Sequence, residues 1–285
     1  MFSFEKLNRK IGGGYSVPFV AELMTSRWAY EGIVVNLFKN NEYEKLLYEI
    51  ERKESFSSYK QTLYVPELKD ITEECRRILN NMNDSTKKIM EYNLVILRNE
   101  IASETQNVSA IKFAYGNKLT LESFDETVAD NTASYLEQLL NYYTENFNAL
   151  SAKKDEIISF FENTPEKAKL AKMVYNQYYN DNLADIVKRA LEKNKIVRYK
   201  GRLVQLIDPI YQEPNESGIL NLKAPFYSAK KLFFGKKIET FTFNIIVIWA
   251  FALMLYITLY FNVLKKILDT GEKIKFGKQG GQQKV

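Results

Sequence analysis

Arg27 and Glu31 are the two residues of this 285-residue sequence whose types and spacing most need a chemical explanation. They lie four positions apart in an apolar stretch from Val17 to Lys45. Residues at this spacing share one face of a helix, so the guanidinium and the carboxylate can pair. Unpaired charges are costly among apolar groups. The spacing therefore predicts an ion pair in a helix that is buried among other helices or lies in a membrane interface.

The rest of the sequence offers little that could catalyse a reaction. It contains no histidine, which excludes imidazole-activated nucleophiles and the usual imidazole metal sites. The glycine-rich stretches IGGGY and GKQGGQQK lack the spacing of a phosphate-binding loop. Acidic pairs such as Glu73 and Glu74 lie in lysine-rich segments and are interpreted as solvated faces. We therefore predict no catalytic residue, no metal site and no cofactor for this chain, and we do not expect an enzyme.

A single cysteine and a dispersed positive charge limit the disulfides and the partners that can be expected of this chain. Cys75 cannot form a disulfide within the chain, and it lies in an apolar stripe with Ile71, Ile78 and Met82. This position predicts a buried structural thiol. The formal net charge of +5 is spread along the chain rather than gathered in one arm, so nucleic acid is not an expected partner.

The strongest structural signal is the segment from Thr240 to Leu264, which contains no charged residue. About 20 apolar residues are enough to cross a bilayer as a helix, so the segment predicts a transmembrane helix in contact with lipid. Aromatic residues and lysines commonly mark the membrane surfaces. The predicted membrane anchors are Trp249, Tyr256, Tyr260, Lys265 and Lys266.

The long polar middle of the chain has the periodicity of helices. Apolar residues recur at spacings of three and four from Leu121 to Leu150, which predicts a long amphipathic helix that runs past Phe160. A second helix is expected to begin at Asp84 or Ser85, and a third at Thr164 with its following proline. In contrast, KIVRYKGRLVQLIDP contains two β-branched runs around Lys-Gly and predicts a small β-hairpin.

The predicted fold class is mainly α, with a helical domain that carries a small β-hairpin, one C-terminal transmembrane helix and an N-terminal re-entrant or interfacial helix. Lysines flank the apolar segment almost equally on both sides, so charge alone does not orient it. No cleavable signal peptide is expected at the start of the chain. The expected divisions are 1–40 (linker and re-entrant or interfacial helix), 41–222 (helical domain), 223–239 (juxtamembrane segment), 240–264 (transmembrane helix) and 265–285 (basic tail).

Two stretches resemble one family of membrane proteins. SRWAYEGIVVNLFKNNEYEK is similar to the segment that ends the permease part of White-type, ABCG-like ATP-driven exporters, with the pattern R-[WY]-x-[FY]-E-[GA] and then N-x-[FY]. LKAPFYSAKKLFFGKKIETFTFNIIVIW resembles the approach to the last transmembrane helix in large bacterial members, which insert a helical domain before that helix. The matching positions of the first stretch are Arg27, Trp28, Tyr30, Glu31, Gly32, Asn36, Leu37 and Phe38.

The resemblance implies the C-terminal permease part of such an exporter, located in a bacterial inner (cytoplasmic) membrane. Residues 41–222 would be extracytoplasmic and the C-terminus cytoplasmic. Walker A and LSGGQ-type motifs are absent from the sequence, so ATP hydrolysis would belong to an ATP-binding/permease partner, or to a missing N-terminal portion, in a dimeric assembly. The structural or gating candidates are Arg27, Trp28, Tyr30, Glu31 and Asn36.

Two other interpretations remain open from the sequence. The chain could be a tail-anchored membrane scaffold whose cytoplasmic helical domain binds a protein partner. A third interpretation is an enzyme of unknown type that acts at the membrane surface, although no convergent polar motif supports it.

Overall fold

The computed structural model describes residues 19–214, 220–221 and 225–263, and it is mainly helical, as predicted. The chain divides into two compact units. The first consists of Met1–Ile33, Glu216–Ala224 and Lys230–Val285, and the second of Val34–Asn215 and Pro225–Ala229. The sequence had suggested a helical domain over 41–222. Helix α2 (Thr25–Lys39) contributes residues to both units.

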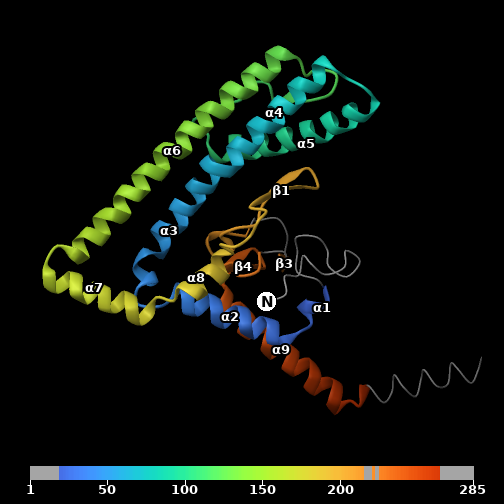
Figure 1. Ribbon diagram of the computed structural model, residues 1–285. Coiled ribbons are helices and arrows are strands. Elements are labelled where there is room, and N and C mark those ends of the chain that lie inside the picture. The colour runs from blue at the N-terminus through green and yellow to red at the C-terminus, as the bar shows by residue number, and fades with distance from the viewer. Residues whose placement is uncertain (1–18, 215–219, 222–224, 264–285) are drawn as a thin grey trace, which may run out of the picture. The chain divides into compact units, whose positions relative to one another are not determined.

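The second unit is built around two antiparallel helical rods (Figure 1). One rod is continuous through α3 (Glu44–Tyr59), a π-helix η2 (Lys60–Tyr64) and α4 (Val65–Asn80). The other rod is α6 (Glu126–Glu162), which has 37 residues. Three ion pairs join the rods and show that they are antiparallel: Glu54–Lys154, Lys69–Glu137 and Arg76–Asp130. From one pair to the next, the residue number rises in the first rod and falls in the second.

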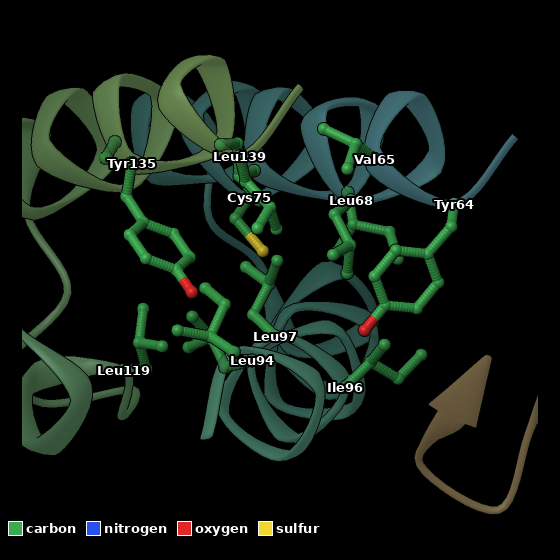
Figure 2. Packing of buried hydrophobic residues seen from close by; sticks show 14 of the residues in the cluster. Tyr64, Val65, Leu68, Cys75, Leu94, Ile96, Leu97, Leu119, Tyr135 and Leu139 are labelled. Carbon is green, nitrogen blue, oxygen red and sulfur yellow. The ribbon is translucent and has the colours of Figure 1, made fainter. Parts of the chain in front are cut away.

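Helix α5 (Asp84–Asn107) packs on α4 and completes the core of the second unit (Figure 2). Its start confirms the prediction, because Asn83 Oδ1 accepts hydrogen bonds from the amides of Ser85 and Thr86. Cys75 lies in this core with none of its surface exposed, as predicted. Burial raises the pKa of its thiol to about 12, whereas Met82 lies beyond α4 and is exposed.

The predicted long helix is confirmed as α6, although it begins later than the apolar stripe does. Asp125 caps it by accepting a hydrogen bond from the amide of Val128, so Leu121 and Phe124 precede the helix and still pack on the core. A 3-10 turn, η3 (Gly116–Lys118), lies in the same connection. Helix α7 (Pro165–Tyr178) starts after Thr164, as predicted, and α8 (Asp181–Lys188) follows it.

The predicted hairpin is also confirmed, as β1 (Ile196–Tyr199) paired antiparallel with β2 (Arg202–Gln205). Lys200 and Gly201 form its two-residue turn, and both have positive φ angles, of 50° and 72°. This combination matches the twist of the paired strands. The hairpin packs on α5, where Asn99 Nδ2 donates a 3.0 Å hydrogen bond to the carbonyl of Gly201. A 3-10 turn, η4 (Pro209–Tyr211), follows.

The first unit combines a short helix α1 (Phe19–Glu22), the start of α2, a three-stranded sheet and helix α9 (Thr240–Tyr260). The antiparallel sheet has the order β3 (Leu220–Asn221), β4 (Lys230–Phe233) and β5 (Lys236–Glu239). The sequence did not predict this sheet, because it lies mostly in the segment interpreted as a juxtamembrane linker. The turn between β4 and β5 places Phe234 and Gly235 at positive φ, so this hairpin also has a two-residue turn.

Helix α9 is the one helix within residues 19–214, 220–221 and 225–263 that is long and apolar enough to cross a membrane. Its 21 residues have a mean hydropathy of 2.1 over the most apolar window, and they span about 31 Å at 1.5 Å per residue. The helix ends at Tyr260, earlier than the predicted Leu264, and Asn262 has a left-handed backbone with φ of 50°. Leu264 lies outside the described residues.

Candidate functional site at the first turn of the apolar helix

Three elements of the first unit bring polar side chains together where α9 begins. Helix α2 supplies Arg27 and Glu31, strand β4 supplies Lys231, and the first turns of α9 supply Asn244. All four are buried, with between none and 7% of their surface exposed. We call these four residues the polar clasp.

Glu31 is the centre of the polar clasp. Lys231 Nζ donates a 2.6 Å hydrogen bond to Glu31 Oε1, and Asn244 Nδ2 lies 3.2 Å from Glu31 Oε2. Asn244 Nδ2 also donates a 2.9 Å hydrogen bond to the carbonyl of Trp28. The carboxylate thus faces a full positive charge on one oxygen and an amide donor on the other, which compensates its loss of water.

The predicted pair between Arg27 and Glu31 exists, but each residue has a closer partner. Arg27 lies 3.9 Å from Glu31 and only 3.0 Å from Glu22. Its guanidinium also lies 4.0 Å from the centre of the Trp28 ring. The expected pair is thus part of a chain of contacts from Glu22 through Arg27 and Glu31 to Lys231, and Lys231 comes from a sheet that was not predicted.

A glycine and three aromatic rings surround the polar clasp. A Cβ atom at Gly32 would lie 3.4 Å from Asn244 Cβ, so the small residue lets α2 and α9 approach closely. The ring of Phe243 lies 5.9 Å from that of Trp28 and 5.7 Å from that of Phe233. These apolar neighbours lower the local polarity, which strengthens the buried pair and makes its disruption costly.

The composition of the polar clasp suits holding and gating better than catalysis. Its one carboxylate is bound by two cations and an amide, so it is not poised to act as a nucleophile or general base. In the part of the chain that the structure describes, there is no group of three or more metal-ligating side chains. The arrangement can lock two helices together, and it can release them if the Glu31 contacts are lost.

The remaining predicted site residues lie elsewhere. Tyr30 is exposed on α2, and Asn36 belongs to the second unit, where its Oδ1 accepts a 2.7 Å hydrogen bond from Asn40. Among the predicted anchors, Tyr256 and Tyr260 are exposed near the end of α9 with stacked rings. Trp249 is the tenth of 21 residues in that helix and is 72% exposed, so it lies far from both ends. Lys265 and Lys266 lie outside the described residues.

Two members of the polar clasp were missed by sequence reasoning. Asn244 carried a usable signal, because a polar residue inside an apolar span is expensive there and commonly functional. Lys231 carried none, since it is one of several lysines before α9 and only the sheet sets its direction. Gly32 was noted as a motif position without a structural reason.

A second buried polar network lies inside the second unit at the π-helix η2. Lys60 Nζ donates a 2.6 Å hydrogen bond to Glu104 Oε1 and lies 3.3 Å from the centre of the Tyr64 ring. Tyr143 donates to the other oxygen of Glu104, at 2.6 Å, and Tyr64 donates to Glu100. Every one of these polar groups has a partner, so the network joins α5, α6 and η2 as a structural element.

No family model matches this chain, and comparisons with curated proteins and with solved structures give no match either.

Proposed function

We propose that this chain is the C-terminal permease part of an ATP-driven membrane exporter. It contributes the last transmembrane helix, α9, and a large extracytoplasmic helical domain, and it has no ATPase activity of its own. The observation that carries the proposal is the attachment of α2 to the first turns of α9. The exporter-like motif lies on α2, and its Glu31 is held by Asn244 of α9.

Most residues of the exporter-like motif have a structural role in this arrangement. Arg27, Trp28 and Glu31 are buried and in contact with one another or with α9, and Gly32 lies beside Asn244 of α9. Tyr30 is the exception, because it is exposed within this chain. In the proposed exporter, Tyr30 faces the permease helices contributed by the partner.

The surface of α9 supports a membrane setting. Large apolar side chains cover it, and only 11% of its most apolar window is buried. Such a surface needs lipid or other apolar helices around it. In the proposal, lipid covers part of α9, and an ATP-binding/permease partner in a dimeric bacterial inner-membrane assembly covers the rest.

The second unit fits the role of an inserted domain because it has its own core. Helices α3 to α6, helix α8 and the β1–β2 hairpin bury apolar residues in its two clusters. We propose that this domain lies outside the cytoplasm, and that the basic tail after α9 lies inside.

One feature favours a second candidate, a tail-anchored scaffold with a cytoplasmic domain that binds a protein. Three apolar residues are more than half exposed: Phe160 near the end of α6, and Leu170 and Met173 of α7. Exposed apolar groups of this kind are found at protein interfaces. A partner that covers them would fit either location, so topology is the property that separates the two functions.

Cysteine labelling of the chain, expressed with its complete transporter, can test the proposal. Lys153→Cys is placed on the exposed side of α6, and Gln279→Cys lies in the basic tail. The unmodified chain is a built-in control, because buried Cys75 should not react. In cells whose outer layer is permeable, a membrane-impermeant thiol reagent should label position 153 and spare position 279. Labelling of position 279 alone would reject the exporter topology and favour the scaffold.

A further inference from the structure

Glu44 stands apart from the other carboxylates of the second unit. It is 1% exposed, and neither of its carboxyl oxygens accepts a hydrogen bond from an N–H or O–H donor of the described residues; the side chain within hydrogen-bonding reach is the carboxyl of Glu51. Its backbone amide donates to Asn41 Oδ1 at 2.8 Å. An ionised carboxylate without a partner is very costly to bury. The local structure therefore favours a protonated Glu44.

The cations near Glu44 are shared with other carboxylates. Lys188 of α8 lies 3.9 Å from Glu51 Oε2, which is also bound by the hydroxyl of Tyr211 in η4 at 2.6 Å. Lys154 of α6 is paired with Glu54. Glu51 follows Glu44 by two turns of α3, so both carboxyls lie on one face of the helix.

Three neutral phenols also lie near Glu44. Tyr43 precedes it, and the rings of Tyr175 and Tyr179, at the end of α7, lie 5.0 Å and 5.4 Å from the ring of Tyr43. These half-buried rings carry no positive charge. The N-terminus of α3 favours a negative charge by about 0.3–1 kcal/mol, which is less than the several kcal/mol that burial of an ion costs.

We propose that Glu44 and Glu51 form a buried proton-binding site, which holds one proton near neutral pH and joins the start of α3 to α8 and η4. Burial, and after it the charge of Glu51, raises the pKa of Glu44 to about 8. The ammonium of Lys188, which also lies near Asp208, can offset only one carboxylate charge at this site. Loss of that proton places a second negative charge in an apolar site.

The elements around the site would respond to that charge. Ala184 and Val187 of α8 and Ile210 of η4 pack in the same small core as Val35 and Phe38 of α2. Because water must reach an ionised Glu44, we expect α8 and η4 to loosen on the side of α3 when the proton leaves. The core formed by α4, α5 and the first half of α6 does not contain the site and should not change.

Infrared spectroscopy of the full chain in a maltoside detergent, which has no carbonyl group, can detect the proton directly. Wild type should show the carbonyl band of a protonated carboxyl near pH 7, and the band should disappear with a midpoint near pH 8. Glu44→Gln should lack the band at neutral pH. Glu42→Gln, which removes an exposed carboxyl two residues away, should retain it.

A second variant tests the coupling of the two carboxyls. Glu51→Gln removes the negative charge next to Glu44, so the midpoint should fall by at least about half a pH unit. Hydrogen exchange measured on the same samples should show faster exchange of residues 181–211 above the midpoint in wild type but not in Glu44→Gln at equal pH. A neutral-pH spectrum in which Glu44→Gln removes no protonated-carboxyl band would overturn the proposal, and so would a midpoint that Glu51→Gln leaves unchanged.

Discussion

Lys231 and Glu31 are 200 positions apart in the chain, and a 2.6 Å hydrogen bond joins them in a site where neither side chain has more than 5% of its surface exposed. A buried pair of this kind adds little net stability to the fold. It constrains the structure nevertheless, because each charge is stable in the interior only while the other is present. The pair thereby fixes strand β4 against helix α2. Asn244 extends the same constraint to α9.

Removal of one charge from this pair should be more harmful than removal of both. We expect Lys231→Met to lower the free energy of unfolding by about 2–4 kcal/mol, because Glu31 would stay buried after losing its hydrogen-bonded cation. The double variant Lys231→Met/Glu31→Gln should recover at least half of that loss. The measurement is the temperature at which the detergent-solubilised protein loses its monodisperse peak in size-exclusion chromatography. Lys236→Met, at an exposed position of β5, is the control. Additive losses would contradict the pairing.

Gly32 should tolerate a methyl group but not a larger side chain. An added Cβ would lie at ordinary contact distance, 3.4 Å from Asn244 Cβ, and alanine favours a helix over glycine by about 1 kcal/mol. Gly32→Ala should therefore leave the unfolding temperature equal or slightly higher. Gly32→Leu should lower it, because the longer side chain would separate α2 from α9 and break the Asn244 contacts. Equal stability of the two variants would show that the helices are not closely packed at this residue.

Glu44 should make the stability of the second unit depend on pH in a defined direction. Its pKa is about 8 in the folded chain and near 4.5 when unfolded, so the folded state binds more protons between these values. The stability that the folded state gains by binding this proton is fully present below about pH 4.5, and it is lost as the pH rises through about 8. The Glu44→Gln variant should gain about 2–4 kcal/mol relative to wild type between about pH 5.5 and pH 9. Thermal unfolding followed by far-UV circular dichroism measures this, and a pH-independent difference would refute it.

Gly201 should be sensitive even to alanine. Its φ of 72° is unfavourable for a side chain, and a Cβ would lie 2.9 Å from Val95 Cγ1 on α5. We expect Gly201→Ala to cost about 1–3 kcal/mol, from strain and from the displaced hairpin. Gly235→Ala is a matched control, because Gly235 has a similar φ of 76° but no atom within 4 Å of an added Cβ. If the two variants lost the same stability, the contact with Val95 would contribute nothing.

Local signals in the sequence were sufficient for most of the helical unit. Asn83, Asp125 and Thr164 each accept a backbone hydrogen bond at the start of a helix, and capping of this kind depends only on neighbours within three residues. The Lys200–Gly201 turn was predictable for the same reason. The late start of α6 shows the limit, since the apolar stripe continues into residues that pack on the core without being helical.

The candidate site was only half predictable, because it depends on long-range contacts. The spacing of Arg27 and Glu31 indicated a pair, but no local pattern could show that Lys231 would be closer to Glu31. Strands β3 and β4 have only two and four residues, too few for a clear alternating pattern, and strand propensity is strongly context-dependent. Glu44 was not noticed for a related reason: in sequence it is one more acid in a charged stretch, and only packing by α7 and α8 buries it.

The main segment of the second unit begins and ends in the same small core. Val34, Val35 and Phe38, from its beginning, share this core with Ile210 and Tyr211, from near its end. A segment whose two ends adjoin can be removed or transplanted without stretching the backbone that carries it. The segment from 34 to 214 therefore has the geometry of a portable cassette, which a short linker could replace in this protein or which a surface turn of an unrelated protein could accept.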